Sequence, residues 1–93
     1  MNPPTGPRFA LGRLVATPMV LERVSADDMQ AALHRHIRGD WGELPEEDRT
    51  ENEVSLKSGL RLVSAYRAAN GVRFWIITEA DRQSTTILLP EEY

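Results

Sequence analysis

Residues 71–93, GVRFWIITEADRQSTTILLPEEY, decide the fold of this chain. Two runs rich in β-forming residues, 72–78 and 84–89, flank a charged turn at 79–83. Asn70-Gly71, just before them, is the sharpest turn signal because both residues tolerate positive φ. A strand near 60–68 should therefore pair with the first run. Successive strands joined by tight turns are antiparallel, so the C-terminal third is predicted to be a three-stranded meander.

Helix signals fill the preceding region. Thr17 can cap a first short helix with Pro18 in its first turn. Ser25 can cap a second helix, in which apolar residues recur at three- and four-residue spacing until Gly39 ends it. Residues 12–16 predict a short strand before these helices.

A third helix is predicted to open at Pro45 and to end at Gly59. It contains few apolar residues, so its packing face must include polar groups such as Asn52 or Ser55. Its acidic side chains form a solvated face in the simplest interpretation. Carboxylates one turn apart would alternatively hold a divalent cation or imitate nucleic acid. The acidic residues are Glu46, Glu47, Asp48, Glu51 and Glu53.

The order of elements predicts an α+β fold: a small two-layer domain with helices packed on one face of a mainly antiparallel, three- to four-stranded meander sheet. Residues 1–11 hold three of the six prolines and should form a flexible, frayed or extended arm. Residues 12–93 should form a single domain.

Composition narrows the class of protein. The 93 residues carry a net charge of −3, and a nonspecific nucleic-acid binder would usually be basic. Nucleic acid is therefore a possible partner that the charge does not favour. The absence of cysteine excludes disulfides, thiolate metal sites and a cysteine nucleophile. No apolar run approaches a membrane span, and the start lacks the apolar core of a signal peptide. We expect a cytoplasmic protein without cofactor or metal.

The two histidines lie two residues apart, in His34-Arg35-His36. Side chains so spaced on a helix point in different directions and cannot chelate one metal ion together. His36 shares the apolar face, which favours a hydrogen-bonded core or boundary histidine. His34 falls on the polar side, either as a plain surface residue or as a general base.

The densest polar cluster follows the turn at 79–83. Arg82 could pair with Asp81 or Glu79 and clamp the hairpin. Alternatively, its guanidinium and nearby hydroxyls could converge on a phosphate or carboxylate. With histidine as the base that extracts a 2′-hydroxyl proton and arginine stabilising the phosphorane, such a site would be a metal-free ribonuclease centre. The candidate catalytic residues are His34, His36, Arg82 and Thr85.

Strand alternation predicts a second candidate surface. Arg73, Trp75 and Ile77 share the face opposite Phe74 and Ile76. If helices cover one face only, the other exposes an aromatic ring beside an arginine, which suits a protein partner or a stacked base. A sheet buried on both sides in an oligomer would explain the pattern equally well.

Trp41 is either a core plug beneath a loop or a stacking platform. Asp40 beside it is expected to cap the following turn. The candidate binding residues are Trp41, Tyr66, Arg73, Trp75, Asp81, Arg82, Ser84 and Thr86.

Three stretches carry a resemblance to a family: RHIRGDWGELPEEDRTEN, GLRLVSAY and WIITEADRQSTTILLPEEY, together covering roughly residues 33–93. They resemble small bacterial "plasmid-related" proteins of mobile elements, a family that implies no particular activity. A weaker, topological resemblance is to ribonucleases of the barnase, EndoU, colicin and RelE type. It implies His34 or His36, Arg82, and Thr85 or Thr86 as site residues, although such toxins are usually basic.

Three functions are compatible with these patterns. The leading hypothesis is a non-enzymatic accessory or interaction domain of mobile elements, binding a protein partner or itself through the sheet face and the hairpin at 79–86. The second is a metal-independent, ribonuclease-like toxin. The third is an acidic inhibitor of a DNA-acting defence enzyme, acting through the helix at 46–53.

Overall fold

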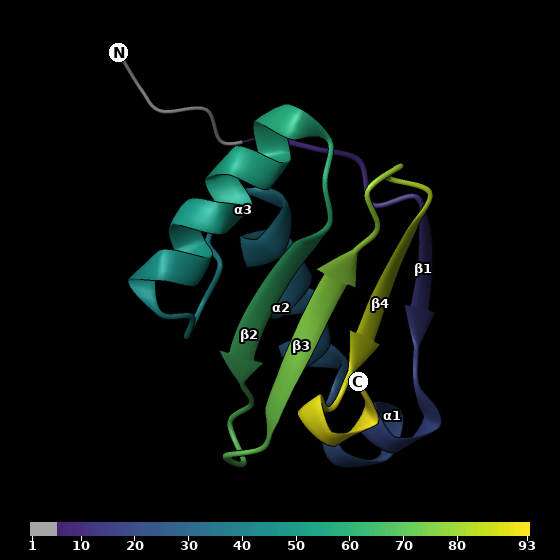
Figure 1. Ribbon diagram of the computed structural model, residues 1–93. Coiled ribbons are helices and arrows are strands. Elements are labelled where there is room, and N and C mark those ends of the chain that lie inside the picture. The colour runs from purple at the N-terminus through teal and green to yellow at the C-terminus, as the bar shows by residue number, and fades with distance from the viewer. Residues whose placement is uncertain (1–5) are drawn as a thin grey trace.

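A computed structural model describes residues 6–93 of the chain (Figure 1). The predicted strands and helices are present, each within a few residues of its expected bounds. In chain order they are β1 (Arg13–Ala16), α1 (Pro18–Arg23), α2 (Ala26–Ile37), α3 (Glu46–Ser58), β2 (Leu62–Arg67), β3 (Arg73–Thr78), β4 (Ser84–Leu88) and the 3-10 turn η1 (Pro90–Glu92).

The strands form one sheet in the order β1-β4-β3-β2. The meander of β2, β3 and β4 is antiparallel, whereas β1 pairs with β4 in parallel. The predicted small α+β fold is confirmed. Turn signals govern only strands that follow one another in sequence, which is why the parallel pairing of β1 could not be predicted.

The helix ends follow the expected capping chemistry. The Thr17 hydroxyl accepts a hydrogen bond from the Val20 N–H at 3.3 Å, and the Ser25 hydroxyl accepts one from the Asp28 N–H at 3.1 Å. Gly59 ends α3 in the left-handed region with φ of 69°. Local sequence therefore sets where these helices begin and end.

The apolar core lies between the sheet and the helices α1 and α2, which cover its inner face (Figure 1). Helix α3 lies beside β2 instead of on that face, which departs from the expectation that all helices share one face. The core consists of Val20, Val24, Met29, Ala32, Tyr66, Ala68, Phe74, Ile76, Ile87 and Leu89.

Polar groups seal the outer edge of β2. The Asn52 side chain donates to the Val63 carbonyl at 2.7 Å and accepts from the Val63 N–H at 3.2 Å. Two residues further on, the Ala65 N–H donates to the Trp41 carbonyl, and the Ala65 carbonyl accepts from the Glu43 N–H. These bonds satisfy the outward backbone groups of an edge strand. The prediction that Asn52 and Ser55 belong to the packing face of α3 is confirmed, since both are buried.

Replacing Asn52 with alanine is expected to lower the free energy of unfolding by about 2 kcal/mol, because two backbone groups of Val63 lose their partners. Urea unfolding followed by circular dichroism measures this change. Thr50→Ala, on the exposed face of the same helix, serves as the control and should shift stability by less than about 0.5 kcal/mol. Equal losses in the two variants would contradict the edge-sealing role.

None of the helices within residues 6–93 is long and apolar enough to cross a membrane.

Candidate functional site

His36 belongs to a chain of hydrogen bonds that runs through the core. Its Nδ1 contacts the Ser64 hydroxyl, and its Nε2 lies 2.9 Å from the Thr78 hydroxyl. The Thr78 hydroxyl lies 2.7 Å from that of Thr85, which donates to the Leu11 carbonyl at 2.7 Å. All four side chains are fully buried. His36 is therefore the hydrogen-bonded core histidine that its place on the apolar face indicated.

The Leu11 carbonyl at the end of this hydrogen-bond network fixes the direction of each bond as far as His36. A carbonyl can only accept, so Thr85 donates to Leu11 and must accept from Thr78. Thr78 then accepts from the Nε2–H of His36. These bonds therefore place a proton on Nε2. Ser64 donates to Nδ1 when the imidazole is neutral. Burial, with the nearby Arg82 charge, lowers the pKa of His36 to about 4.

Aromatic rings close the space around His36. The ring of Phe9 meets the imidazole edge-on with centroids 5.1 Å apart, and Trp41 does so at 5.9 Å. The Trp41 indole donates to Glu53 at 2.9 Å and is only 4% exposed. Glu53 also pairs with Arg8 at 2.9 Å. The alternative of Trp41 as a stacking platform is therefore wrong, and the core-plug interpretation describes it.

Arg82 clamps the hairpin turn, but through carbonyl groups. Its Nη1 donates to the Leu60 carbonyl at 2.7 Å and to the Glu79 carbonyl at 3.1 Å, and its Nη2 donates to the Ser55 carbonyl at 3.2 Å. The expected pairing with the Asp81 or Glu79 carboxylate is corrected by these contacts. A phosphate site built on this guanidinium would have to compete with carbonyls that already occupy both terminal nitrogens.

Asp81 has its own role in the turn. Its carboxylate accepts a hydrogen bond from the Gln83 N–H at 3.0 Å, and the residue between them, Arg82, has a positive φ of 61°. Such a side-chain bond to the backbone two residues on stabilises a tight turn. The exposed Asp81 therefore helps to shape the hairpin through the backbone of Gln83.

The residues proposed for a ribonuclease centre do not meet in an open cleft. His36 and Thr85 are enclosed in the core, and Arg82 is held by carbonyls. His34 is exposed and lines a hollow of about 210 Å³ with Leu11, Leu33 and Ile37. The histidine on which the Arg82 charge acts, His36, is thus buried and not open to a substrate.

The outer face of the sheet carries several of the predicted binding residues. Period-two alternation and the strand register place Arg73, Trp75, Ser84 and Thr86 on this face. Tyr66 is on the opposite face, 2% exposed, with its hydroxyl donating to the Asp40 carbonyl at 2.6 Å. The prediction of Tyr66 as an exposed binding residue is wrong for that reason.

The end of the chain covers part of this outer face (Figure 1). The rings of Trp75 and Tyr93 meet at 64° with centroids 5.5 Å apart, and the Tyr93 hydroxyl accepts from Arg61 at 2.9 Å. Ile77 and Leu88 also point to this face yet are buried. The half-buried Trp75 therefore lies at the border between the covered and the open part of the sheet.

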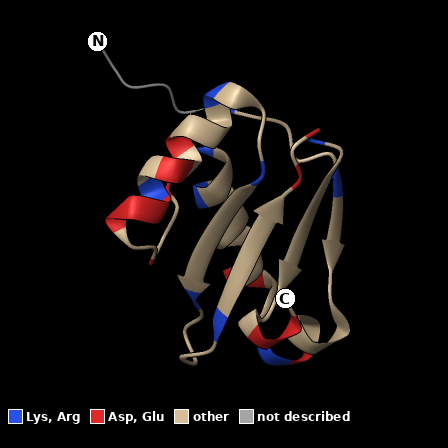
Figure 2. Cartoon of the chain, viewed as in Figure 1, with Lys and Arg blue, Asp and Glu red and all other residues tan. Residues whose placement is uncertain are grey.

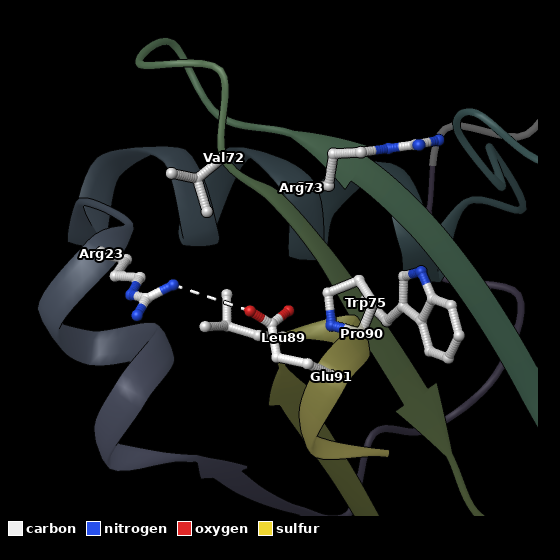
Figure 3. Close-up of a pocket in the computed structure, with 7 residues that line it drawn as sticks. All are labelled: Arg23, Val72, Arg73, Trp75, Leu89, Pro90 and Glu91. Atoms are coloured by element: carbon white, nitrogen blue, oxygen red, sulfur yellow. Dashed lines mark ion pairs between the residues drawn. The ribbon is translucent and has the colours of Figure 1, made fainter.

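Two hollows adjoin at Trp75. The first has a volume of about 360 Å³. Figure 3 shows Arg23 and Glu91 facing each other there, 3.6 Å apart, while the Arg73 side chain points away from this ion pair. The hollow is lined by Arg23, Val72, Arg73, Trp75, Leu89, Pro90 and Glu91.

The second hollow, of about 300 Å³, lies between α3 and the sheet. Val63 and Trp75 contribute apolar surface, and Asp48 and Glu51 bring carboxylates from α3. It is lined by Leu44, Asp48, Glu51, Asn52, Arg61, Val63 and Trp75. The two hollows and the indole between them, the Trp75 site, are the strongest candidate for a binding site in the described residues.

Charge around the Trp75 site is divided. Arg67 and Arg73 lie near Glu43, at 3.5 and 3.9 Å, and Arg73 is more than half exposed. Carboxylates of α3 border the opposite hollow. Figure 2 shows the acidic segments of α3 interrupted by a basic one. Within residues 6–93, no group of three or more His, Asp or Glu side chains is placed to hold a metal ion.

Comparison of the chain with family models, with curated proteins and with solved structures found no match. The resemblances to plasmid-related proteins and to ribonucleases therefore stay predictions.

The sequence patterns indicated Trp75 and Arg73 but not most of the other lining residues, such as Val63 and Arg61, nor Tyr93, whose ring packs on Trp75. Val63 could have been found, because pairing of β2 with β3 places it on the same face as Trp75. Arg61 and Tyr93 have no comparable signal. Their hydrogen bond joins residues 32 positions apart, and only the folded chain brings them together.

Proposed function

We propose that this chain is a non-enzymatic interaction domain that binds an extended segment of a partner protein at the Trp75 site. The observation that supports this proposal best is the half-buried indole between two adjoining hollows, with arginine beside one and carboxylates beside the other. Aromatic anchors flanked by polar groups are typical of protein-binding surfaces.

The partner segment follows from the lining of the site. An apolar side chain would pack on Trp75 and Val63, and a basic residue would lie near Asp48 and Glu51. An acidic residue on the other side would approach Arg73, whose guanidinium is largely exposed. An association with mobile elements remains part of this proposal only through the resemblance of the sequence.

Peptide selection on the immobilised chain tests the proposal. Selected peptides should bind with an affinity that Trp75→Ala weakens about 30-fold, the loss typical of a central aromatic anchor. Fluorescence anisotropy with labelled peptide measures this. Leu21→Ala, which truncates a more exposed side chain outside the site, should leave the affinity unchanged. Equal losses in both variants, with both folded by circular dichroism, would contradict the proposal.

An RNA assay separates this proposal from the ribonuclease hypothesis. Labelled RNA is incubated with the chain and with His34→Ala, both without added metal. His34 is the informative position because it is exposed, whereas His36 and Arg82 are bound within the fold and their loss would unfold the site. We expect no cleavage by either protein. Cleavage by the parent that His34→Ala loses would overturn the non-enzymatic proposal.

A further inference from the structure

Strand β1 forms the outermost strand of the sheet, opposite the sealed edge of β2. The Arg13 N–H donates to the Gln83 carbonyl and the Thr17 N–H to the Ile87 carbonyl. Because these groups alternate along a strand, Leu14 and Ala16 direct their N–H and C=O groups away from the sheet. Within residues 6–93 no strand lies beyond them.

The β1 edge is also apolar. Leu14 is 50% exposed, Val15 is 40% exposed and Leu21 of α1 is 58% exposed. A hollow of about 420 Å³ lies on the inner side of this edge. It is lined by Leu14, Ala16, Leu21, Ala26, Met29, Gln30, Leu33 and Ile87. An open strand edge with apolar side chains is a template for pairing with another chain.

We propose that β1 pairs in antiparallel fashion with β1 of a second copy of this chain, giving a symmetric dimer with a continuous sheet. The twofold axis passes beside Val15, so Leu14 of each copy lies opposite Ala16 of the other. This interface is distinct from the Trp75 site and does not depend on the function proposed for that site.

The backbone favours this register over its neighbours. An antiparallel pair needs two residues whose N–H and C=O groups both point across the gap. Leu14 and Ala16 satisfy this condition, and pairing each with the other in both copies forms four hydrogen bonds. The next outward position is Pro18, which has no N–H, so the ladder ends there.

The side chains fit the same register. Opposed residues of an antiparallel pair project to the same face. Leu14 of the second copy therefore lies beside Ala16, whose small side chain borders the hollow under the edge. Each copy thus supplies a leucine to the hollow of the other, and the exposed Leu14 side chains become buried.

Charge complementarity supports a second copy as the occupant. In this register Arg13 lies opposite Thr17 of the other copy. The Thr17 hydroxyl donates to the carboxylate of Glu92 at 2.7 Å, which places an acidic group at that position. Within the described residues Arg13 forms no ion pair. Symmetry would create this Arg13–Glu92 contact twice.

Sedimentation velocity over a concentration series tests the dimer. The weight-average mass should rise from the 10.5 kDa of one chain toward twice that value. Leu14→Lys should weaken association at least about tenfold, because it places a charge in the apolar interface. Val54→Lys is the matched control, since Val54 is equally exposed but lies on α3. A constant mass of one chain, or equal weakening by both variants, would overturn the proposal.

A cysteine scan tests the register itself, because the chain has no cysteine of its own. Val15 faces its own copy across the axis as a non-hydrogen-bonded pair, with Cα atoms about 4.5 Å apart, a separation suited to a disulfide. Val15→Cys should crosslink to a dimer under mild oxidation. Cysteines replacing Arg13 would be about 13 Å apart and should not crosslink. Equal crosslinking at both positions would overturn the register.

Discussion

Acidification from pH 6.5 to about pH 4 is expected to cost this protein about 3 kcal/mol of stability through His36 alone. Burial, together with the nearby Arg82 charge, lowers the pKa of His36 from 6.5 in the unfolded chain to about 4 in the fold, so the imidazole is neutral at neutral pH. Between these values the unfolded chain binds the additional proton, so stability falls as the pH falls. Urea unfolding at intervals across this window measures the slope.

His36→Gln isolates this contribution. Glutamine can donate and accept as the imidazole does but cannot be protonated, so the variant should lose the slope between pH 6.5 and 5. NMR of the imidazole nitrogens provides a check that does not depend on the variant folding. It should show a proton on Nε2 and none on Nδ1 at neutral pH. A free energy of unfolding in the parent that stays constant over this window would contradict the neutral buried histidine.

Gly42→Ala is expected to lower the free energy of unfolding by roughly 3 to 5 kcal/mol. Gly42 has φ of 77°, and an added methyl group would overlap the carbonyl oxygen of Ala65 and come within 2.8 Å of the Tyr66 ring. Neither neighbour can move easily, because Ala65 is held in the sheet and Tyr66 in the core. Thermal and urea unfolding measure the change.

Gly59→Ala provides the matched control for that prediction. Gly59 has a similar φ of 69°, but an added methyl group meets nothing within 4 Å. Its cost should be that of the left-handed backbone alone, about 1 kcal/mol. The difference between the two variants then measures the close approach of the 41–43 segment to β2. Equal costs would show that backbone conformation, and not this contact, accounts for the effect.

Local signals predicted most of the fold. Thr17, Ser25 and Gly59 cap helices by interactions with residues close in sequence, so their roles can be inferred from spacing. The meander likewise follows from its turns. The parallel pairing of β1 with β4 and the position of α3 beside β2 depend on contacts between distant segments, to which no local pattern corresponds.

The site was predictable only in part, for a related reason. Alternation along β3 correctly separated Trp75 from Phe74. No local pattern indicated that Arg82 would bind carbonyl groups instead of carboxylates, because two of its partners, Ser55 and Leu60, are more than 20 residues away in the sequence. The same limit applies to Thr85, whose hydroxyl donates to the carbonyl of Leu11, 74 positions earlier in the sequence.

The hydrogen bonds of Arg82 connect the turn at 79–83 to the C-terminal end of α3, although strands β2 and β3 lie between them in the sequence. One guanidinium links the carbonyls of Leu60 and Ser55 to the loop between β3 and β4. Lysine could not replace it, because a single ammonium cannot span two such separated groups. A shorter turn grafted between these strands, without Arg82, would remove the hydrogen bonds to the Ser55 and Leu60 carbonyls. A change to the loop between β3 and β4 therefore also changes a contact of α3.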